Sequence, residues 1–475
     1  MIDRRELLAL AEAVSLQPRV IEKDYVLGWI LAGINAHAAL TGTWLFKGGT
    51  CLKKCYFETY RFSEDLDFTV ADAAQIDQTF LTKSFTEIAA WVYEQSGIEI
   101  PAERLRFDVF ANRRGKPAAE GRVYYRGPIA PASRDLPRIK LDLTSDEIVV
   151  LPSVIRDVVH PYSDKREGGI KIRCYAYEEV FGEKVRALGE RARPRDLYDV
   201  INLYRHNDFQ PTPSAILDVL RRKCAFKNIQ VPTFDTIKTF FDELAGDWVA
   251  MLGHQLPALP PLNSFWDVLP EFFAWLAGGA RPVMPAAYPL AGGEAVLRPT
   301  LGTIAVPGAF ASALEIIRFA AANRLIVEID YVKENGEHTT REIEAYSLRS
   351  TQAGHVVLHA FDMNRNDHRS YRTERIRGAR ATARTFVPRY AIELTPSGPQ
   401  NAPSIARAPA NIGSVARRTP VRAPARPHNG LTYVFQCPVC SKKFERRNYD
   451  ATLRPHKNPG GWNCPGRTGF YVGTK

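Results

Sequence analysis

Two acidic residues, two positions apart, are the first feature of the sequence that could do chemistry. Asp65 and Asp67 lie in FSEDLDFTV, residues 62–70, where polar and apolar positions alternate as in a strand. Residues two apart in a strand point to the same face, so the carboxylates would repel each other unless a cation lay between them. Hard oxygen ligands on one face suit Mg²⁺, or Mn²⁺ in its place. An Asp-x-Asp pair alone is more often a solvated strand end.

A glycine turn precedes this pair. Lys47-Gly48-Gly49-Thr50 follows a short apolar run and leads into a stretch compatible with a helix. Glycines let the backbone approach an anion closely, and a helix start offers unpaired N–H groups. The turn is therefore a possible phosphate cradle, although Gly-Gly before a helix is common.

A third carboxylate completes the set. Asp142 lies between apolar neighbours in RIKLDLT, residues 138–144, and a lone carboxylate in such a strand should be paired or bound to metal. It could join Asp65 and Asp67 from a neighbouring strand. Two metal ions held by three carboxylates can activate a hydroxyl and stabilise leaving pyrophosphate. The parts for nucleotidyl transfer are thus present.

The surrounding patterns predict the elements that position these residues. Helical periodicity indicates helices, and alternation indicates successive strands between 106 and 144. The expected helical segments are 5–38, 75–97, 176–207 and 213–251. This mixture predicts an α+β core, and a second set of strands between 325 and 376 predicts a multidomain chain.

The order of these motifs resembles the AbiEii/AbiGii-type nucleotidyltransferase toxins, a branch of the DNA polymerase beta-like superfamily. KGGTCLKKCY followed by RFSEDLDF carries the likeness, with IEKDYVLGWIL (21–31) and YEEVFGEKVRALGERARPRDLYDV (177–200). The resemblance covers about residues 5–250 and implies a nucleotidyltransferase domain over 1–253, with a polymerase beta-like core and a helical C-terminal part. It also implies a toxin of a bacterial toxin–antitoxin or abortive-infection system for phage defence. Such an enzyme transfers NMP from an NTP to RNA, with tRNA the expected acceptor, and its antitoxin would be a separate protein.

The same resemblance implies roles for individual residues. The catalytic and metal-binding carboxylates would be Asp65, Asp67 and Asp142, the last also a candidate base. The residues around the nucleotide or acceptor would be Lys47, Gly48, Gly49, Thr50, Ser63, Lys184, Arg195, Asp196 and Asp199. From spacing alone, Asp196 and Asp199 share a helix face, so they could equally form a structural ion-pair network with Arg191 and Arg195.

Residues 327–376 resemble a WYL domain, a small SH3-like β-barrel expected over 301–395. The matching features are Tyr331, Leu358, Ala360, Phe361, Arg369, Arg372 and Arg375. Val356 and Val357 stand where Trp and Tyr give the domain its name, which puts small-ligand binding in doubt. The domain could sense a ligand or nucleic acid, or serve as a scaffold.

Two stretches read as linkers. The segment 254–300 is rich in Pro and Gly and should be a linker with some local order. Residues 396–430 contain seven prolines, five arginines and no acidic residue. That composition cannot bury a core, so we expect a disordered, extended linker.

The terminal module, residues 431–475, has the spacing of a zinc finger. Three thiolates and one imidazole, from Cys437, Cys440, His456 and Cys464, would fill a tetrahedral Zn²⁺ shell with no open position. The zinc is expected to be structural, because so small a module without an evident core would fold on metal. Lys442, Lys443, Arg446 and Arg447, interleaved with aromatic residues, could bind nucleic acid. Docking on a protein partner is the alternative.

Charge and cysteine usage limit the cellular setting. Residues 396–475 carry 13 Lys and Arg against 2 Asp and Glu, while the whole chain has a formal net charge of +11. A basic tail on a neutral body indicates a polyanion near the tail. The other cysteines, Cys51, Cys55, Cys174 and Cys224, are scattered singly, which argues against a disulfide framework. Without a signal peptide or a membrane-length apolar stretch, the expected setting is cytoplasmic, with no membrane contact.

Two other functions remain open at this point. The chain could be a catalytically silent nucleic-acid-binding sensor or regulator in phage defence, although the intact Gly-Gly and Asp motifs argue against degeneration. It could also be a phosphotransferase that moves the γ-phosphate, in which case no pyrophosphate would form.

Overall fold

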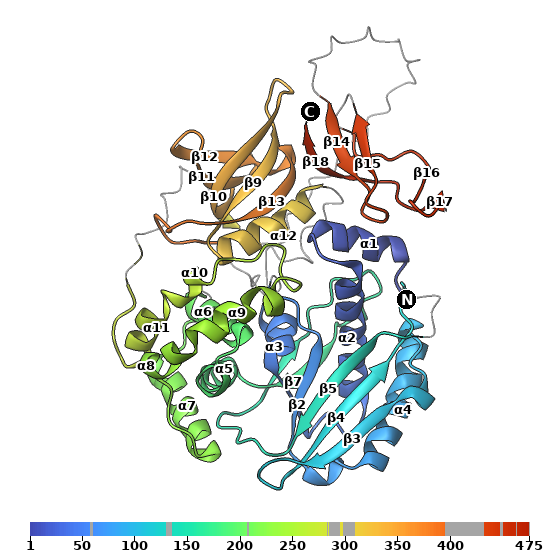
Figure 1. Cartoon of the computed structure of the whole chain (residues 1–475), viewed down its shortest axis with the longest axis vertical. Coiled ribbons are helices and arrows are strands. Elements are labelled where there is room, and N and C mark those ends of the chain that lie inside the picture. Colours follow the sequence, from blue (N-terminus) through green and yellow to red (C-terminus); the bar gives the residue numbers. More distant parts are fainter. Residues whose placement is uncertain are drawn as a thin grey trace. The chain divides into compact units, whose positions relative to one another are not determined.

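The structure is a computed structural model of the chain (Figure 1). It describes residues 1–57, 60–129, 135–206, 209–282, 284, 295–297, 309–394, 432–446, 450–461 and 463–474. The chain forms two compact units, Met1–Ala402 and Pro403–Lys475, and each is described by itself. This division does not test the predicted boundaries at 253, 300, 395 and 430, which stay predictions.

A seven-stranded mixed sheet forms the centre of the first unit, in the order β3-β4-β5-β2-β1-β7-β6. Two neighbouring pairs, β2 with β5 and β1 with β7, are parallel, and the other pairs are antiparallel. The strands are β1 (Trp44–Lys47), β2 (Asp65–Val70), β3 (Arg106–Ala111), β4 (Pro117–Tyr124), β5 (Arg138–Thr144), β6 (Val154–Asp157) and β7 (Lys171–Cys174). The acidic motifs therefore lie on adjacent strands near the middle of the sheet.

One face of this sheet is apolar and buried. Leu66, Phe68 and Leu141 alternate with the polar residues of β2 and β5 and are fully buried. Helices α2 (Pro18–Ala36) and α4 (Gln78–Ser96) pack against this side. Burying each such side chain contributes roughly 1.5–3 kcal/mol, so this face anchors the fold and leaves the polar face for chemistry.

Most of the remaining helices in the nucleotidyltransferase part of the first unit lie in the segments expected to be helical. They are α1 (Arg4–Ala13), α3 (Gly48–Cys51), α5 (Tyr177–Arg191), α6 (Pro194–Arg205), α7 (Pro213–Lys227), α8 (Phe234–Ile237), α9 (Phe241–Leu252), α10 (Asn263–Trp266) and α11 (Leu269–Leu276). The last two lie in the segment predicted as a linker. Phe265 of α10 stacks on Tyr198, and Phe272 of α11 stacks on Phe181. These short helices belong to the core, because their aromatic residues fill space between α5 and α6.

A second sheet carries the C-terminal part of the first unit, with the strand order β12-β11-β10-β9-β13 and β8 beside β10. Its elements are β8 (Ala295–Leu297), α12 (Ala309–Ala322), β9 (Leu325–Val332), β10 (His338–Ser350), β11 (Val356–Asp362), β12 (Asp367–Arg372) and β13 (Ile376–Thr385). Helix α12 packs on β9 and β13 and also touches α1. Among the described strands no pairing joins β12 to β13, so closure into an SH3-like barrel stays a prediction.

The second unit consists of short strands. A three-stranded sheet has the order β15-β14-β18, and β16 pairs with β17. The strands are β14 (Tyr433–Gln436), β15 (Lys443–Arg446), β16 (His456–Lys457), β17 (Asn463–Cys464) and β18 (Phe470–Thr474). The predicted disordered linker, 396–430, lies outside the described residues. No described helix combines the length and apolarity that crossing a membrane requires.

Candidate active site

The register between β2 and β5 brings the carboxylates together. Asp67 is the direct partner of Asp142 across these parallel strands, and Asp65 is the partner of Lys140. Asp65 and Asp67 share the polar face of β2, since the residues between and after them are buried. Burial and the facing charge of Asp142 raise the pKa of Asp67 to about 6. The same two causes raise the pKa of Asp65.

These raised pKa values are what a cation site shows when its carboxylates must share a small space. The three carboxylates nevertheless do not converge on one point. Asp142 Oδ1 lies 3.1 Å from Lys140 Nζ. Among the described residues, the groups of three or more ligand atoms within 4.8 Å of one another do not include this triad. Mg²⁺ commonly binds one or two carboxylates together with substrate phosphates, so the donor set fits such an ion.

The glycine turn packs directly against the acidic strand. Gly48 has φ +80°, and a Cβ there would lie 2.1 Å from Asp67 Oδ2. A Cβ on Gly49 would lie 2.5 Å from Arg61 Nη2 and 3.2 Å from Ser63 Oγ. The Thr50 hydroxyl donates to the Asp65 carbonyl at 2.5 Å. The turn therefore holds β2 close, and Thr50 ties the two motifs together.

Asp199 lies at the centre of a buried ion-pair network. It accepts hydrogen bonds from Arg61 Nε at 2.6 Å and Nη2 at 2.7 Å, and its Oδ2 lies 2.7 Å from Lys184 Nζ. Burial alone would raise the pKa of Asp199, but Arg61 and Lys184 hold it well below its usual range. Asp196 binds Arg191 at 2.7 Å and lies 3.6 Å from Lys184. Of the ion pairs that one interpretation of their spacing expected, the structure contains Asp196 with Arg191, whereas Asp199 binds Arg61 and Lys184.

Arg195 stands apart from that network. It joins none of the ion pairs among the described residues, and its Nε donates to the Met251 carbonyl at 3.3 Å. Its positive charge instead acts on Asp65, where it partly offsets the rise in the pKa of that carboxyl. In the same way Lys47 and Lys184 partly offset the rise in the pKa of Asp67. Three cations from distant parts of the chain therefore surround the carboxylates.

Sequence reasoning did not single out two residues that support this site. Lys23 Nζ lies 2.5 Å from Glu64 Oε2, next to Asp65. Arg61 is 2% exposed and binds both Asp199 and Gln255. Lys23 lies in the segment 21–31 and Arg61 in RFSEDLDF, two of the segments that carry the family resemblance. Their presence in these segments could have identified them as candidate site residues.

A family model described as "Nucleotidyl transferase AbiEii toxin, Type IV TA system" matches residues 29–277. The chain belongs to the AbiEii family. It is therefore a nucleotidyltransferase. A second model, the WYL domain, matches residues 312–381 of this transferase.

The solved structures similar to this AbiEii transferase include two bacterial proteins. MenT4, a nucleotidyltransferase toxin from Mycobacterium tuberculosis, is 18% identical with a TM-score of 0.36; the match covers 57% of this chain and 87% of that one. Proteasome accessory factor B/C of Arthrobacter aurescens is 13% identical with a TM-score of 0.16; the match covers 79% of this chain and 74% of that one. No curated protein matches the chain.

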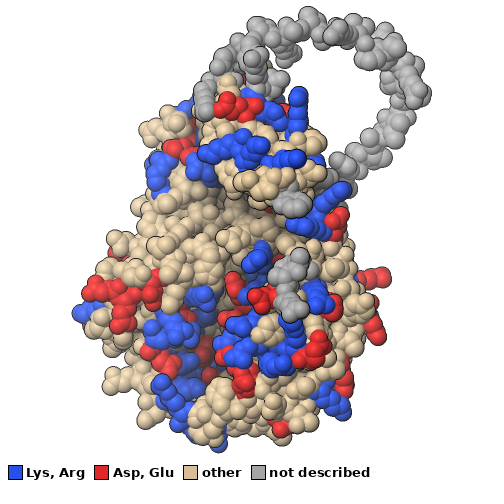
Figure 2. All heavy atoms as spheres, turned by 45° about the vertical axis from the view of Figure 1, so that its right-hand side comes forward, with Lys and Arg blue, Asp and Glu red and all other residues tan. Residues whose placement is uncertain are grey.

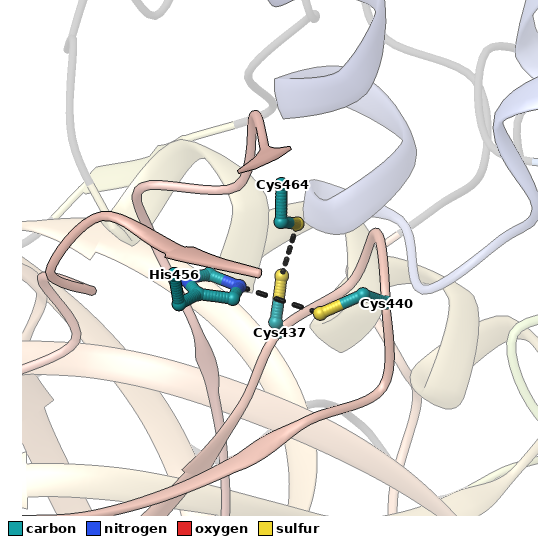
Figure 3. A group of neighbouring side chains, drawn as sticks. All are labelled: Cys437, Cys440, His456 and Cys464. Atoms are coloured by element: carbon teal, nitrogen blue, oxygen red, sulfur yellow. Dashed lines mark hydrogen bonds between the residues drawn. The ribbon is translucent and has the colours of Figure 1, made fainter. Parts of the chain in front are cut away.

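The C-terminal unit of the AbiEii transferase brings four soft ligands together (Figure 3). The ligand atoms of Cys437, Cys440, His456 and Cys464 all lie within 4.8 Å of one another. Cys440 Sγ is 3.3 Å from His456 Nε2, and Cys437 Sγ is 3.7 Å from Cys464 Sγ. His456 Nδ1 lies 2.9 Å from the Arg454 carbonyl, so a proton on Nδ1 would leave Nε2 free to bind metal. Three thiols and one imidazole fit a closed Zn²⁺ site.

This unit also has a small apolar cluster, contrary to the expectation of no evident core. Phe435 and Leu453 are buried beside two of the cysteines. Lys442 and Lys443 are exposed, and Arg446 donates to the Thr452 carbonyl. Arg447 lies outside the described residues.

A second group of thiols lies in the transferase core, where single scattered cysteines were expected. Cys51, Cys55 and Cys174 are buried, with their sulfur atoms within 4.8 Å of one another. The pairing of β1 with β7 brings Cys174 here, because it is the partner of Phe46. The grouping follows from tertiary pairing and has no counterpart in sequence spacing.

Proposed function

We propose that this enzyme transfers NMP from an NTP to an RNA acceptor, with tRNA as the substrate, in a reaction that needs a divalent metal ion. The observation that carries the proposal is the register of β2 and β5, which places Asp142 opposite Asp67 with Asp65 on the same face. Burial and the charge of Asp142 raise the pKa of Asp67 in spite of the nearby cations Lys47 and Lys184, so the site would favour further positive charge. A substrate complex of metal and phosphates would supply it.

Each part of the chain has a task in this reaction. Asp65 and Asp67 would hold Mg²⁺ or Mn²⁺, which when bound neutralises phosphate charge and makes the acceptor hydroxyl more acidic. Asp142 would take the proton of that hydroxyl. The acceptor oxygen then bonds to the α-phosphorus, the bond to the β-phosphate breaks, and pyrophosphate leaves. Lys184, held by Asp199 at 2.7 Å, would face the phosphate charge.

The rest of the nucleotide site is the glycine turn. Gly48 and Gly49 would let the backbone approach a phosphate near the carboxylates, with Lys47 and Ser63 beside the turn. Thr50 would act through its bond to the Asp65 carbonyl rather than through a free hydroxyl. The positive charge of Arg195 interacts electrostatically with Asp65, and this side chain would face the acceptor or the phosphates.

The C-terminal unit would bind structural Zn²⁺ and contact RNA through Lys442, Lys443, Arg446 and Arg447. A separate antitoxin protein would restrain the enzyme in the cytoplasm. The description of the family as a toxin of a type IV toxin–antitoxin system supports the toxin role.

The test uses purified protein, Mg²⁺, bulk tRNA and each NTP in turn, labelled at the α-phosphate. We expect label on RNA with at least one NTP, lost in Asp65→Ala. Asp108→Ala is the matched control, because Asp108 is an exposed carboxylate on β3, with 62% of its side chain accessible. Absence of label with every NTP would oppose the proposal and favour the catalytically silent regulator. Label transferred only from the γ-phosphate would identify a phosphotransferase.

A further inference from the structure

A large basic pocket adjoins the carboxylates on the first unit. Its volume is about 770 Å³, and its lining cations are Arg19, Lys23, Arg104, Arg106 and Arg138. Tyr124 lines the same space, and Glu64 and Asp135 are its acidic members. In the space-filling view, Lys and Arg side chains gather with acidic ones over the lower part of the molecule (Figure 2). The pocket carries a surplus of positive charge.

Three of these arginines form no ion pair among the described residues. Lys23, by contrast, is paired with Glu64 at 2.5 Å. The ion pairs of the described part of the chain include none of Arg19, Arg106 and Arg138. Arg106 donates to backbone carbonyl groups, and Arg138 donates to the Tyr124 hydroxyl at 3.4 Å. Hydrogen bonds to neutral groups orient a guanidinium and leave its charge available for an anion.

The pocket lies beside the catalytic face, because residues next to the carboxylates in sequence or on the same strand line it. Glu64 precedes Asp65 in the chain. Arg138 and Asp142 share the polar face of β5, so at 3.3 Å per residue their Cα atoms are about 13 Å apart. The glycine turn follows β1, on the opposite side of β2 from β5. The carboxylates therefore lie between the turn and the pocket.

We propose that this pocket binds the single-stranded end of the acceptor nucleic acid, with Arg19, Arg106 and Arg138 at its phosphates and Tyr124 against a base. The inference rests on the proposed function and adds where the acceptor lies. A concave site of this volume holds a strand end rather than the side of a duplex. Cations combined with an aromatic ring are the usual composition of a site for unpaired nucleotides.

The position of the pocket would also set the directions from which the acceptor strand and the triphosphate approach the carboxylates. A strand end bound there would reach the carboxylates from the β5 side, with its terminal hydroxyl beside Asp142. The triphosphate would approach from the side of Gly48. Attacking and leaving groups would then stand on opposite sides of the α-phosphorus, as displacement at phosphorus requires.

The test compares Arg106→Gln/Arg138→Gln with a charge-matched control, Arg126→Gln/Arg222→Gln. The control arginines are exposed, pair with Glu99 and Asp218, and lie outside the pocket. The assay is steady-state transfer of α-label from NTP to bulk tRNA, with each substrate varied. We expect the pocket variant to raise the KM for RNA about tenfold or more, on the order of 1–3 kcal/mol for the lost contacts. The KM for NTP should change less than about twofold.

Salt dependence gives an independent measure. Removing two phosphate contacts should reduce the slope of log KM for RNA against log salt by about 1.4. Arg106→Lys/Arg138→Lys keeps the charge and should restore that slope. Thermal unfolding of both glutamine variants checks that they fold.

An unchanged KM for RNA in a folded pocket variant would overturn the inference. An equal rise in the KM for NTP would mean that the pocket holds the nucleotide instead. If the wild type labels no RNA, the proposed function fails, and the pocket is then tested by binding of fluorescent single-stranded RNA and DNA oligonucleotides to Asp65→Ala. Binding that the glutamine pair abolishes would uphold the pocket, and binding that it leaves unchanged would refute it.

Discussion

Replacing Gly48 with alanine tests the contact between the glycine turn and the acidic strand. The new Cβ would lie 2.1 Å from Asp67 Oδ2, whereas real Cβ atoms essentially never come within 3.0 Å of another heavy atom. The Asp67 carboxylate must therefore move by about 0.9 Å. A displacement of about 1 Å at a reacting centre costs roughly 10²-fold in rate. That loss corresponds to about 2.7 kcal/mol in the barrier.

Backbone strain is a separate effect of the same substitution. Gly48 has φ +80°, and a left-handed conformation costs an alanine about 1–2 kcal/mol. Gly115 has φ +71°, and a Cβ added there would have no heavy atom within 4 Å, so Gly115→Ala carries the strain without the collision. Gly42 has neither a left-handed backbone conformation nor a heavy atom within 4 Å of an added Cβ. Gly42→Ala therefore controls for the replacement of glycine by alanine alone.

The assay is transfer of α-labelled NMP at saturating NTP and tRNA, with Mg²⁺ varied, alongside thermal unfolding. Gly48→Ala should lose about 10²-fold in kcat and need more Mg²⁺, while Gly115→Ala should lose stability only. Wild-type activity in folded Gly48→Ala would refute the reasoning, because the turn would then not constrain Asp67. So would an equal loss of activity in Gly115→Ala.

Three further predictions follow from charge and metal binding. Asp67→Asn should abolish transfer yet stabilise the metal-free protein at pH 8 by about 3 kcal/mol. The raised pKa of Asp67 means that the folded protein loses stability as the pH rises through about 6, and the neutral amide avoids this loss; urea unfolding in EDTA checks it. Asp199→Asn should destabilise the first unit by about 3–5 kcal/mol, against under about 0.5 kcal/mol for exposed Asp218→Asn. Because the pKa of Asp199 is lowered, its ionised form stabilises the folded protein above about pH 4, and this stabilisation is lost as the pH falls further. The difference in unfolding free energy between wild type and Asp199→Asn should therefore shrink in acid. A difference that stays constant with pH would contradict this prediction. Cys440→Ser, or a zinc chelator, should abolish hydrogen-exchange protection in residues 432–474 and leave the melting of the first unit unchanged; protection that survives in metal-free protein would contradict a structural zinc site.

Local patterns in the sequence predicted many of the elements and the family. The alternation around Asp65 and Asp67 predicted β2, and the glycines predicted the turn that starts α3, because these signals depend on neighbours a few residues apart. The motif order between 21 and 200 predicted the AbiEii family, and the family model confirmed it. The Cys and His spacing at the C-terminus predicted a group of four ligands, which the structure brings together.

Local signals did not reveal how distant segments meet. The pattern of α10 and α11 is too short to distinguish from a linker, and only packing on α5 and α6 makes these helices part of the core. The grouping of Cys51, Cys55 and Cys174 depends likewise on strand pairing across the sheet. Such contacts are decided by which surfaces exclude water together, and one local window does not contain that information.

By itself, therefore, the sequence determined the acidic strand, the glycine turn, the zinc-type ligand set and the family. Each of these features depends on the types and spacing of residues that lie close together in the sequence. Only the tertiary structure decided that Asp142 lies opposite Asp67, since strand register is a property of two segments packed on one core. It also decided that Arg61 binds Asp199 across 138 residues of chain. The same holds for the basic pocket, where arginines from α2, β3 and β5 line one space although these segments are far apart in the sequence and β4 lies between β3 and β5.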